Sequence, residues 1–201
     1  MNTPALTLAG LGQPESGVGR AIYYPLLAIL GSVAIGAAAQ FQVPFYPVPM
    51  TLQTLAVLII GGAFGWRLGA ATVLLYILEG AAGIPFFAGG AAGPAVLAGP
   101  TGGYLWGFVV AAALVGFLAQ RGFDRHAGKM LLATLAGGII LYIPGILWLT
   151  LWIMQAKTMH ASAAFEAALA AGLYPFILGD LVKAGLAAMA FPAAWMLFDN
   201  K

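Results

Sequence analysis

Cysteine and charge are what this sequence lacks most. None of its 201 residues is cysteine, which excludes disulfides, iron–sulfur clusters and thiolate zinc sites. Lys, Arg, Asp and Glu make up 7% of the chain, whereas about a quarter of a soluble domain is charged. So little charge cannot coat a globule in water. The net charge of +2 includes no basic block, so we expect no nucleic-acid partner.

Motifs for catalysis are also missing. The two histidines, His126 and His160, both fall outside the apolar stretches. The sequence contains no Gly-x-Ser-x-Gly, no His-Glu-x-x-His and no Gly-x-x-x-x-Gly-Lys-Ser/Thr. We therefore expect no catalytic residues, no metal site, no cofactor and no ATP site in this chain. An intramembrane enzyme and a structural membrane protein remain as alternatives from other classes.

Long apolar stretches are abundant, and 62% of the residues are hydrophobic. A membrane-spanning helix needs about 20 mostly apolar residues. Residues 51–82 are too long for one span, because 32 helical residues would reach about 48 Å against a hydrocarbon core of about 30 Å. They predict two short helices with a turn at residues 65–69. We predict an all-α integral membrane protein with six transmembrane helices, at residues 21–41, 51–66, 68–82, 104–120, 130–156 and 175–198.

The ends of the chain and the charges between the helices predict its organisation and orientation. Residues 1–19 have no basic cluster and are expected to form a polar tail, leaving residues 20–201 as one membrane domain. Residues 157–173 are expected to form an interfacial helix, and residues 121–129 a solvated turn. With six spans, one side holds six basic residues and the other only Lys157. The positive-inside rule then places both termini in the cytoplasm of a multi-pass protein of the cell (inner) membrane. The six are Arg20, Arg67, Arg121, Arg125, Lys129 and Lys201.

The segment between the third and fourth expected helices is rich in glycine and proline. Residues 83–103 contain seven glycines and three prolines but no charge. Flexible linkers exposed to water are usually polar, so this loop is expected to be embedded. Irregular backbone at membrane depth is tolerated where it is buried in protein or lines a cavity. We therefore interpret this outer loop as a wall or lid of a binding pocket.

Two charged residues lie inside the last expected helix. Asp180 and Lys183 are three residues apart and so share one helical face, in its outer half. A charge inside a membrane costs roughly 3 kcal/mol or more, and such residues usually serve function. We interpret the two as polar anchors for a ligand that enters from outside. The alternative is an ion pair that neutralises itself and only packs helices.

Other candidates lie at the same depth. Glu79 ends the third expected helix and Gln53 begins the second, while Phe87 and Tyr104 offer aromatic surface beside them. Such a mixture suits a small, partly apolar ligand with a few hydrogen-bonding groups. Glu79 is alternatively a snorkelling or capping carboxylate, and Gln53 a simple interface residue.

Three stretches resemble one transporter family. They are "VPMTLQTLAVLIIGGAFGWRLGA" (residues 48–70), "GIPFFAGGAAGPAVLAGPTGGYLWGF" (83–108) and "LGDLVKA" (178–184). They resemble BioY, the biotin-binding S-component of energy-coupling-factor (ECF) vitamin transporters. The resemblance runs in register from about Ala21 to Phe198. An S-component for another vitamin is the alternative within this class.

The resemblance implies an outward-opening biotin pocket in which Asp180 and Lys183 hydrogen-bond the polar parts of biotin, its ureido ring in particular. Glu79 matches a polar position of the family. Some members carry an arginine in the long loop that could meet the biotin carboxylate, but residues 90–100 contain none. Backbone N–H groups of the Gly-rich loop, Gly90 among them, or the Lys183 ammonium would then bind the carboxylate.

The family also implies partners. Biotin uptake would be energised by a transmembrane coupling subunit and ATPase subunits, with the loaded protein rotating in the lipid bilayer. Small residues at four-residue spacing on the first helix, here Ala34 and Ala38, would dock on the coupling subunit. A homo-oligomer is left open.

Overall fold

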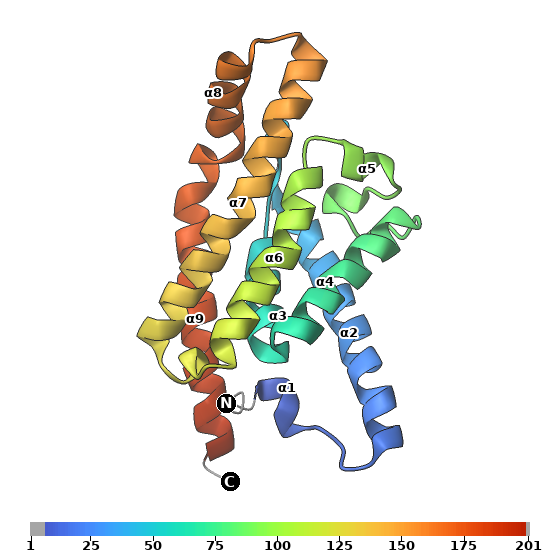
Figure 1. Ribbon diagram of the computed structural model, residues 1–201, viewed down its shortest axis with the longest axis vertical. Coiled ribbons are helices and arrows are strands. Elements are labelled where there is room, and N and C mark those ends of the chain that lie inside the picture. The colour runs from blue at the N-terminus through green and yellow to red at the C-terminus, as the bar shows by residue number, and fades with distance from the viewer. Residues whose placement is uncertain (1–6, 200–201) are drawn as a thin grey trace.

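The computed structural model describes residues 7–199, which are mostly helical (Figure 1). Lys201, one of the six basic residues counted above, lies outside the described residues. The α-helices are α1 (Leu8–Leu11), α2 (Gly17–Gln40), α3 (Gln53–Phe64), α4 (Trp66–Ala81), α5 (Ala95–Ala98), α6 (Gly102–Ala119), α7 (Ala127–Lys157), α8 (Ala161–Gly172) and α9 (Ile177–Asp199). Short 3₁₀ turns are η1 (Ala88–Gly90), η2 (Phe123–Arg125) and η3 (Tyr174–Phe176), and two strands are β1 (Gln42–Val43) and β2 (Met50–Thr51).

The first long helix begins earlier than its hydropathy predicts. α2 starts at Gly17 because the Ser16 hydroxyl caps it, accepting a hydrogen bond from the Gly19 N–H at 3.0 Å. The preceding residues of the expected polar tail include α1. The Tyr23 hydroxyl donates to the Ala9 carbonyl at 2.9 Å, which joins this part of the tail to α2.

The expected turn between two short helices is present. Gly65 has φ +80°, a left-handed conformation that favours glycine, and it separates α3 from α4. The turn packs closely on α6, since a Cβ at Gly116 would lie 2.5 Å from the backbone nitrogen of Trp66. Close approach of helix backbones through glycine is typical of packing in membranes.

α7 is one continuous helix through Pro144 and packs along α6. A Cβ at Gly107 of α6 would lie 2.4 Å from the Leu141 carbonyl oxygen of α7, and one at Gly103 would lie 2.4 Å from the Pro144 carbonyl oxygen. α8 folds back against α7, and α9 then runs alongside it (Figure 1). The end of the molecule formed by α8 and the last turns of α7 is opposite the end that holds α1 (Figure 1).

The sequence predicted a solvated turn at residues 121–129, but part of this turn is buried. Asp124 is completely buried, and its Oδ2 accepts a hydrogen bond from the Trp195 indole N–H at 2.8 Å. The Arg125 guanidinium carbon lies 3.3 Å from the centroid of the Trp195 ring. Burial raises the pKa of the Asp124 carboxyl above its ordinary value, although the Trp195 hydrogen bond and the Arg125 charge act in the opposite direction. Trp195 approaches from α9, a contact that the sequence could not reveal.

Four described helical segments are long and apolar enough to span a membrane. They are Gly17–Gln40, Gly102–Ala119, Ala127–Lys157 and Ala161–Leu197. Their outward faces carry large apolar side chains such as Leu178, which is 78% exposed, and Ile139, which is 69% exposed. Apolar surface of this kind fits lipid better than water. α3, with 12 residues, and α4, with 16, are shorter than a typical span, so the expected count of six exceeds what helix length alone supports.

Candidate ligand-binding site

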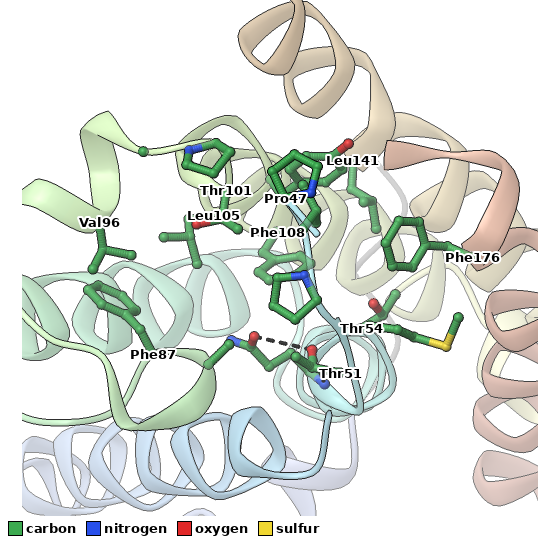
Figure 2. A pocket seen from close by; sticks show the side chains of 18 of the residues that line it. Pro47, Thr51, Thr54, Phe87, Val96, Thr101, Leu105, Phe108, Leu141 and Phe176 are labelled. Carbon is green, nitrogen blue, oxygen red and sulfur yellow. Dashed lines mark hydrogen bonds between the residues drawn. The ribbon is translucent and has the colours of Figure 1, made fainter. Parts of the chain in front are cut away.

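A cavity of about 440 Å³ lies where α3, α6, α7 and α9 meet the two irregular segments of the chain. This volume falls within the roughly 300–1,000 Å³ of small-molecule sites. Residues 47–51, which include strand β2, form one wall. Residues 87–101, within the Gly-rich segment 83–103, form another. In Figure 2, Phe87 and Val96 lie on the opposite side of the cavity from Phe176. Both irregular segments therefore line a cavity, as irregular backbone at membrane depth requires.

A charged cluster forms the polar part of this cavity. The Lys183 ammonium donates to Asp180 Oδ1 at 2.8 Å, and the Tyr142 hydroxyl donates to Asp180 Oδ2. All three side chains line the cavity. Lys183 is only 6% exposed, so its charge needs the Asp180 counter-ion. Among the described residues, only Asp180 accepts a hydrogen bond from this ammonium, which has three donors. Two donors are therefore left for a ligand.

A second polar group lies at the start of α3. Gln53 is buried, and its side-chain amide donates to the Tyr76 hydroxyl at 2.7 Å. The Thr51 hydroxyl donates to the Gln53 carbonyl oxygen at 3.2 Å, and Tyr76 donates in turn to the Phe86 carbonyl at 3.4 Å. Gln53 and Thr51 line the cavity. The network thus links the start of α3, which lines the cavity, to Phe86 near the beginning of the Gly-rich segment.

Aromatic rings complete the cavity walls. Phe87 is 2% exposed and its ring packs edge-on against Tyr76, with centroids 5.7 Å apart. A Cβ at Gly80 would lie 2.5 Å from this ring, so the backbone of α4 supports Phe87 directly. The Tyr104 hydroxyl donates to the Gly172 carbonyl at 2.9 Å, which connects α6 to the end of α8. These contacts hold the walls in place without a ligand.

The structure brings together most of the residues that the sequence singled out. Five of them line the cavity, namely Gln53, Phe87, Tyr104, Asp180 and Lys183. Glu79 and Gly90 are not among the lining residues. Glu79 is half-buried in the last turn of α4, and its Oε2 is buried without a hydrogen-bond partner among the described residues. Gly90 is exposed, with φ +74°.

Ala34 and Ala38 lie elsewhere, on α2. Ala34 is exposed and Ala38 is half-buried, and neither lines the cavity. Their position is therefore separate from the ligand site. Within the described part of the chain, no three His, Asp or Glu side chains are grouped as metal ligands.

Sequence reasoning missed Tyr142 and the threonines that line the cavity, Thr51, Thr54 and Thr101. Tyr142 is a phenol near the middle of the 31-residue α7, and a polar group at such a depth was the available signal. The sequence could not show that it faces α9 rather than lipid.

Comparison with known proteins shows the family of this chain. A family model described as the BioY family matches residues 15–200. The chain belongs to the BioY family. It is 38% identical over 149 residues to a probable biotin transporter BioY of Pyrococcus horikoshii, covering 74% of this chain and 82% of the relative. It is 34% identical over 155 residues to the biotin transporter BioY of Thermotoga maritima, covering 77% and 85%.

The fold is also similar to that of a solved structure. The crystal structure of the S-component for biotin from an ECF-type ABC transporter superposes with a TM-score of 0.72. The match covers 91% of this chain and 95% of the other, at 22% sequence identity. This likeness establishes the fold, while the family match rests on the sequence.

Proposed function

We propose that this chain is the substrate-binding subunit of a biotin uptake system and captures biotin in the cavity. The observation that carries the proposal is the buried Asp180–Lys183 pair, which opens into an otherwise mainly apolar cavity of a BioY-family chain. The relatives named above are biotin transporters, and transport rather than catalysis is the activity of this family.

The chemistry of biotin suits the cavity. Its ureido ring offers two N–H donors and a carbonyl, and its sulfur-containing ring and aliphatic chain are apolar. The Asp180 carboxylate can accept from one ureido N–H group, and Lys183 can donate to a carbonyl or carboxylate. The rings of Phe87, Phe108 and Phe176 would bury the apolar parts. This division of polar and apolar groups supports biotin over a highly charged substrate.

The biotin carboxylate needs a donor of its own. The cavity wall includes Gly99, Pro100 and Thr101, directly before the start of α6, and none of its lining residues within 7–199 is arginine. Backbone N–H groups of the Gly-rich segment are one choice of donor, and Lys183 is the other. Lys183 would bind the carboxylate only if the ureido carbonyl lies elsewhere. Gly90 and Glu79 would join the site only if the segment closes over the ligand.

The chain is a multi-pass membrane protein, and we place it with six spans and both termini in the cytoplasm. α3 and α4 are then short spans of about 18 and 24 Å. The thickness above α3 would be occupied by residues 42–52, of which residues 47–51 line the cavity. The basic residues Arg67, Arg121 and Lys129 lie at the cytoplasmic end in this placement, consistent with the positive-inside rule.

Transport would need partners, namely a coupling subunit and ATPase subunits of an ECF system. The small-residue face of α2 that holds Ala34, which is exposed, and Ala38, which is half-buried, is the proposed docking surface. We expect Ala38→Leu to leave biotin binding unchanged but to impair uptake in cells that contain the partner subunits, because the longer side chain separates the helices. Uptake of labelled biotin measures this effect.

Ala21→Leu is the matched control for that prediction, because Ala21 is exposed near the start of α2 and lies about 140° around the helix from Ala34 and about 100° from Ala38. It should support normal uptake. Equal uptake by both variants would remove this face of α2 from the docking surface.

The direct test of the proposed function is calorimetric titration of the purified protein in detergent with biotin, thiamine and riboflavin. Tight binding of biotin alone is expected. Absence of heat with biotin from protein that shows a cooperative thermal unfolding transition would refute biotin as the ligand. Binding of thiamine or riboflavin instead would support an S-component for another vitamin.

A further inference from the structure

The charged cluster of Asp180, Lys183 and Tyr142 is built from two helices. Asp180 and Lys183 both belong to α9, whereas Tyr142 belongs to α7. The two oxygens of Asp180 have separate donors, with Lys183 on Oδ1 and Tyr142 on Oδ2. An ionised carboxylate has about four lone-pair sites. One site on each oxygen therefore stays open, and Asp180 lines the cavity.

The ring of Tyr142 is held in place by its neighbours. It packs edge-to-face against Tyr104, with ring centroids 6.0 Å apart and planes at 89°. Tyr104 is buried and is fixed by its hydrogen bond to the Gly172 carbonyl. A Cβ at Gly145 of α7 would lie 2.6 Å from the Tyr104 ring, so this ring rests on the backbone of the helix that carries Tyr142. The phenol is thus pre-positioned before a ligand arrives.

The effect of Tyr142 on Asp180 follows from the spacing of the ion pair. Lys183 lies three residues after Asp180 on one helical face, where a flexible ammonium can reach both carboxylate oxygens. A hydroxyl donor on Oδ2 competes with that arrangement. Without it, the carboxylate is free to turn both oxygens to Lys183 and away from the cavity.

We propose that Tyr142 is a positioning residue that determines specificity for a neutral, urea-like ring. The proposal rests on biotin being the ligand. Tyr142 keeps Oδ2 from turning to Lys183, so that Asp180 can accept from one ring N–H while Lys183 donates to the neighbouring ring carbonyl.

The charge balance beside the ring gives the preference for a neutral ring. Among the described residues that line the cavity, Asp180 and Lys183 are the only ones with formal charges, and they cancel. The Tyr142 hydroxyl further satisfies the carboxylate without adding charge. A cationic ring in the same place would meet the Lys183 ammonium and a carboxylate whose charge is already shared between two donors. Without the hydroxyl, Asp180 turns to Lys183, and a neutral ring loses both the acceptor for its N–H and the donor for its carbonyl. A cationic ring has no acceptor for Lys183 and therefore loses less.

The test compares biotin with 2-iminobiotin, in which a guanidine replaces the urea and is protonated at neutral pH. Tyr142→Phe keeps the ring but removes the hydroxyl, and Tyr174→Phe is the control, because Tyr174 is exposed on η3. We expect Tyr142→Phe to weaken biotin binding about tenfold, the size of a hydrogen bond to a charged group. The affinity for 2-iminobiotin should fall less, so that the ratio of the two dissociation constants changes. Tyr174→Phe should change neither constant.

Several outcomes would overturn the inference. Tyr142→Phe with wild-type affinity for biotin would show that the hydroxyl is not needed. An equal loss of affinity for biotin and 2-iminobiotin would assign Tyr142 a merely structural role. A lowered thermal unfolding midpoint of the same variant would support that role. If the unaltered protein binds no biotin, the proposed function itself fails and the inference fails with it. Biotin binding by the unaltered protein separates the two cases.

Discussion

Replacing Asp180 with alanine is expected to weaken biotin binding by at least about tenfold. A hydrogen bond to a charged group contributes roughly 1.5–3 kcal/mol, and this carboxylate offers the open acceptor sites of the cavity. The change also leaves the ammonium of Lys183, which is 6% exposed, without its counter-ion. Loss of one partner of a buried pair costs about 3–5 kcal/mol. Titration calorimetry measures the first effect and thermal unfolding the second.

Two companion variants separate these effects. Asp180→Asn keeps the shape of the side chain but loses its charge, and Asp180→Ala combined with Lys183→Met removes both charges of the pair. The double variant should recover much of the lost stability but none of the lost affinity. Unchanged biotin affinity in Asp180→Ala would return the ion pair to the alternative interpretation, in which it only packs helices.

Replacing Gly107 with alanine is expected to reduce both stability and affinity. Its Cβ would lie 2.4 Å from the Leu141 carbonyl oxygen and 3.0 Å from the Leu141 Cα, so α6 and α7 must separate. Overpacking of this kind costs about 1–3 kcal/mol. Leu141 directly precedes Tyr142, and both line the cavity, so the displacement reaches the ligand site. Thermal unfolding and biotin titration on the same preparation measure the two losses.

Gly138→Ala provides the matched control. Gly138 is also inside a long helix, α7, but a Cβ there would meet nothing within 4 Å. Both substitutions gain about 1 kcal/mol of helix propensity, so only the close contact distinguishes them. Gly138→Ala should be neutral or slightly stabilising. Equal midpoints for the two variants would mean that α6 and α7 do not approach as closely as the structure indicates.

The helices were predictable because hydrophobic length is a local property. A run of apolar residues without charge indicates a span, and the excess length of residues 51–82 predicted a turn that the structure places at Gly65. The boundaries were less predictable. α2 begins at Gly17, four residues before the apolar run, because the Ser16 cap stabilises an end that hydropathy does not detect.

The candidate site was predictable where charge conflicts with its surroundings. Asp180 and Lys183 stand out in any apolar helix, and their spacing alone places them on one face. Glu79 stands out for the same reason, yet it is not among the residues that line the cavity. The local sequence indicates that a charge is unusual at a given depth. It does not indicate whether the rotation of the helix directs that side chain into the cavity.

The amino-acid sequence alone determined the class of this protein, the approximate positions of its long helices and the shared helical face of Asp180 and Lys183. These features depend on composition and on spacing within one helix. Only the tertiary structure decided that Tyr142 of α7 meets Asp180 of α9 and that Trp195 buries Asp124. Such contacts depend on the rotation and separation of neighbouring helices, which close packing at glycines such as Gly107 sets.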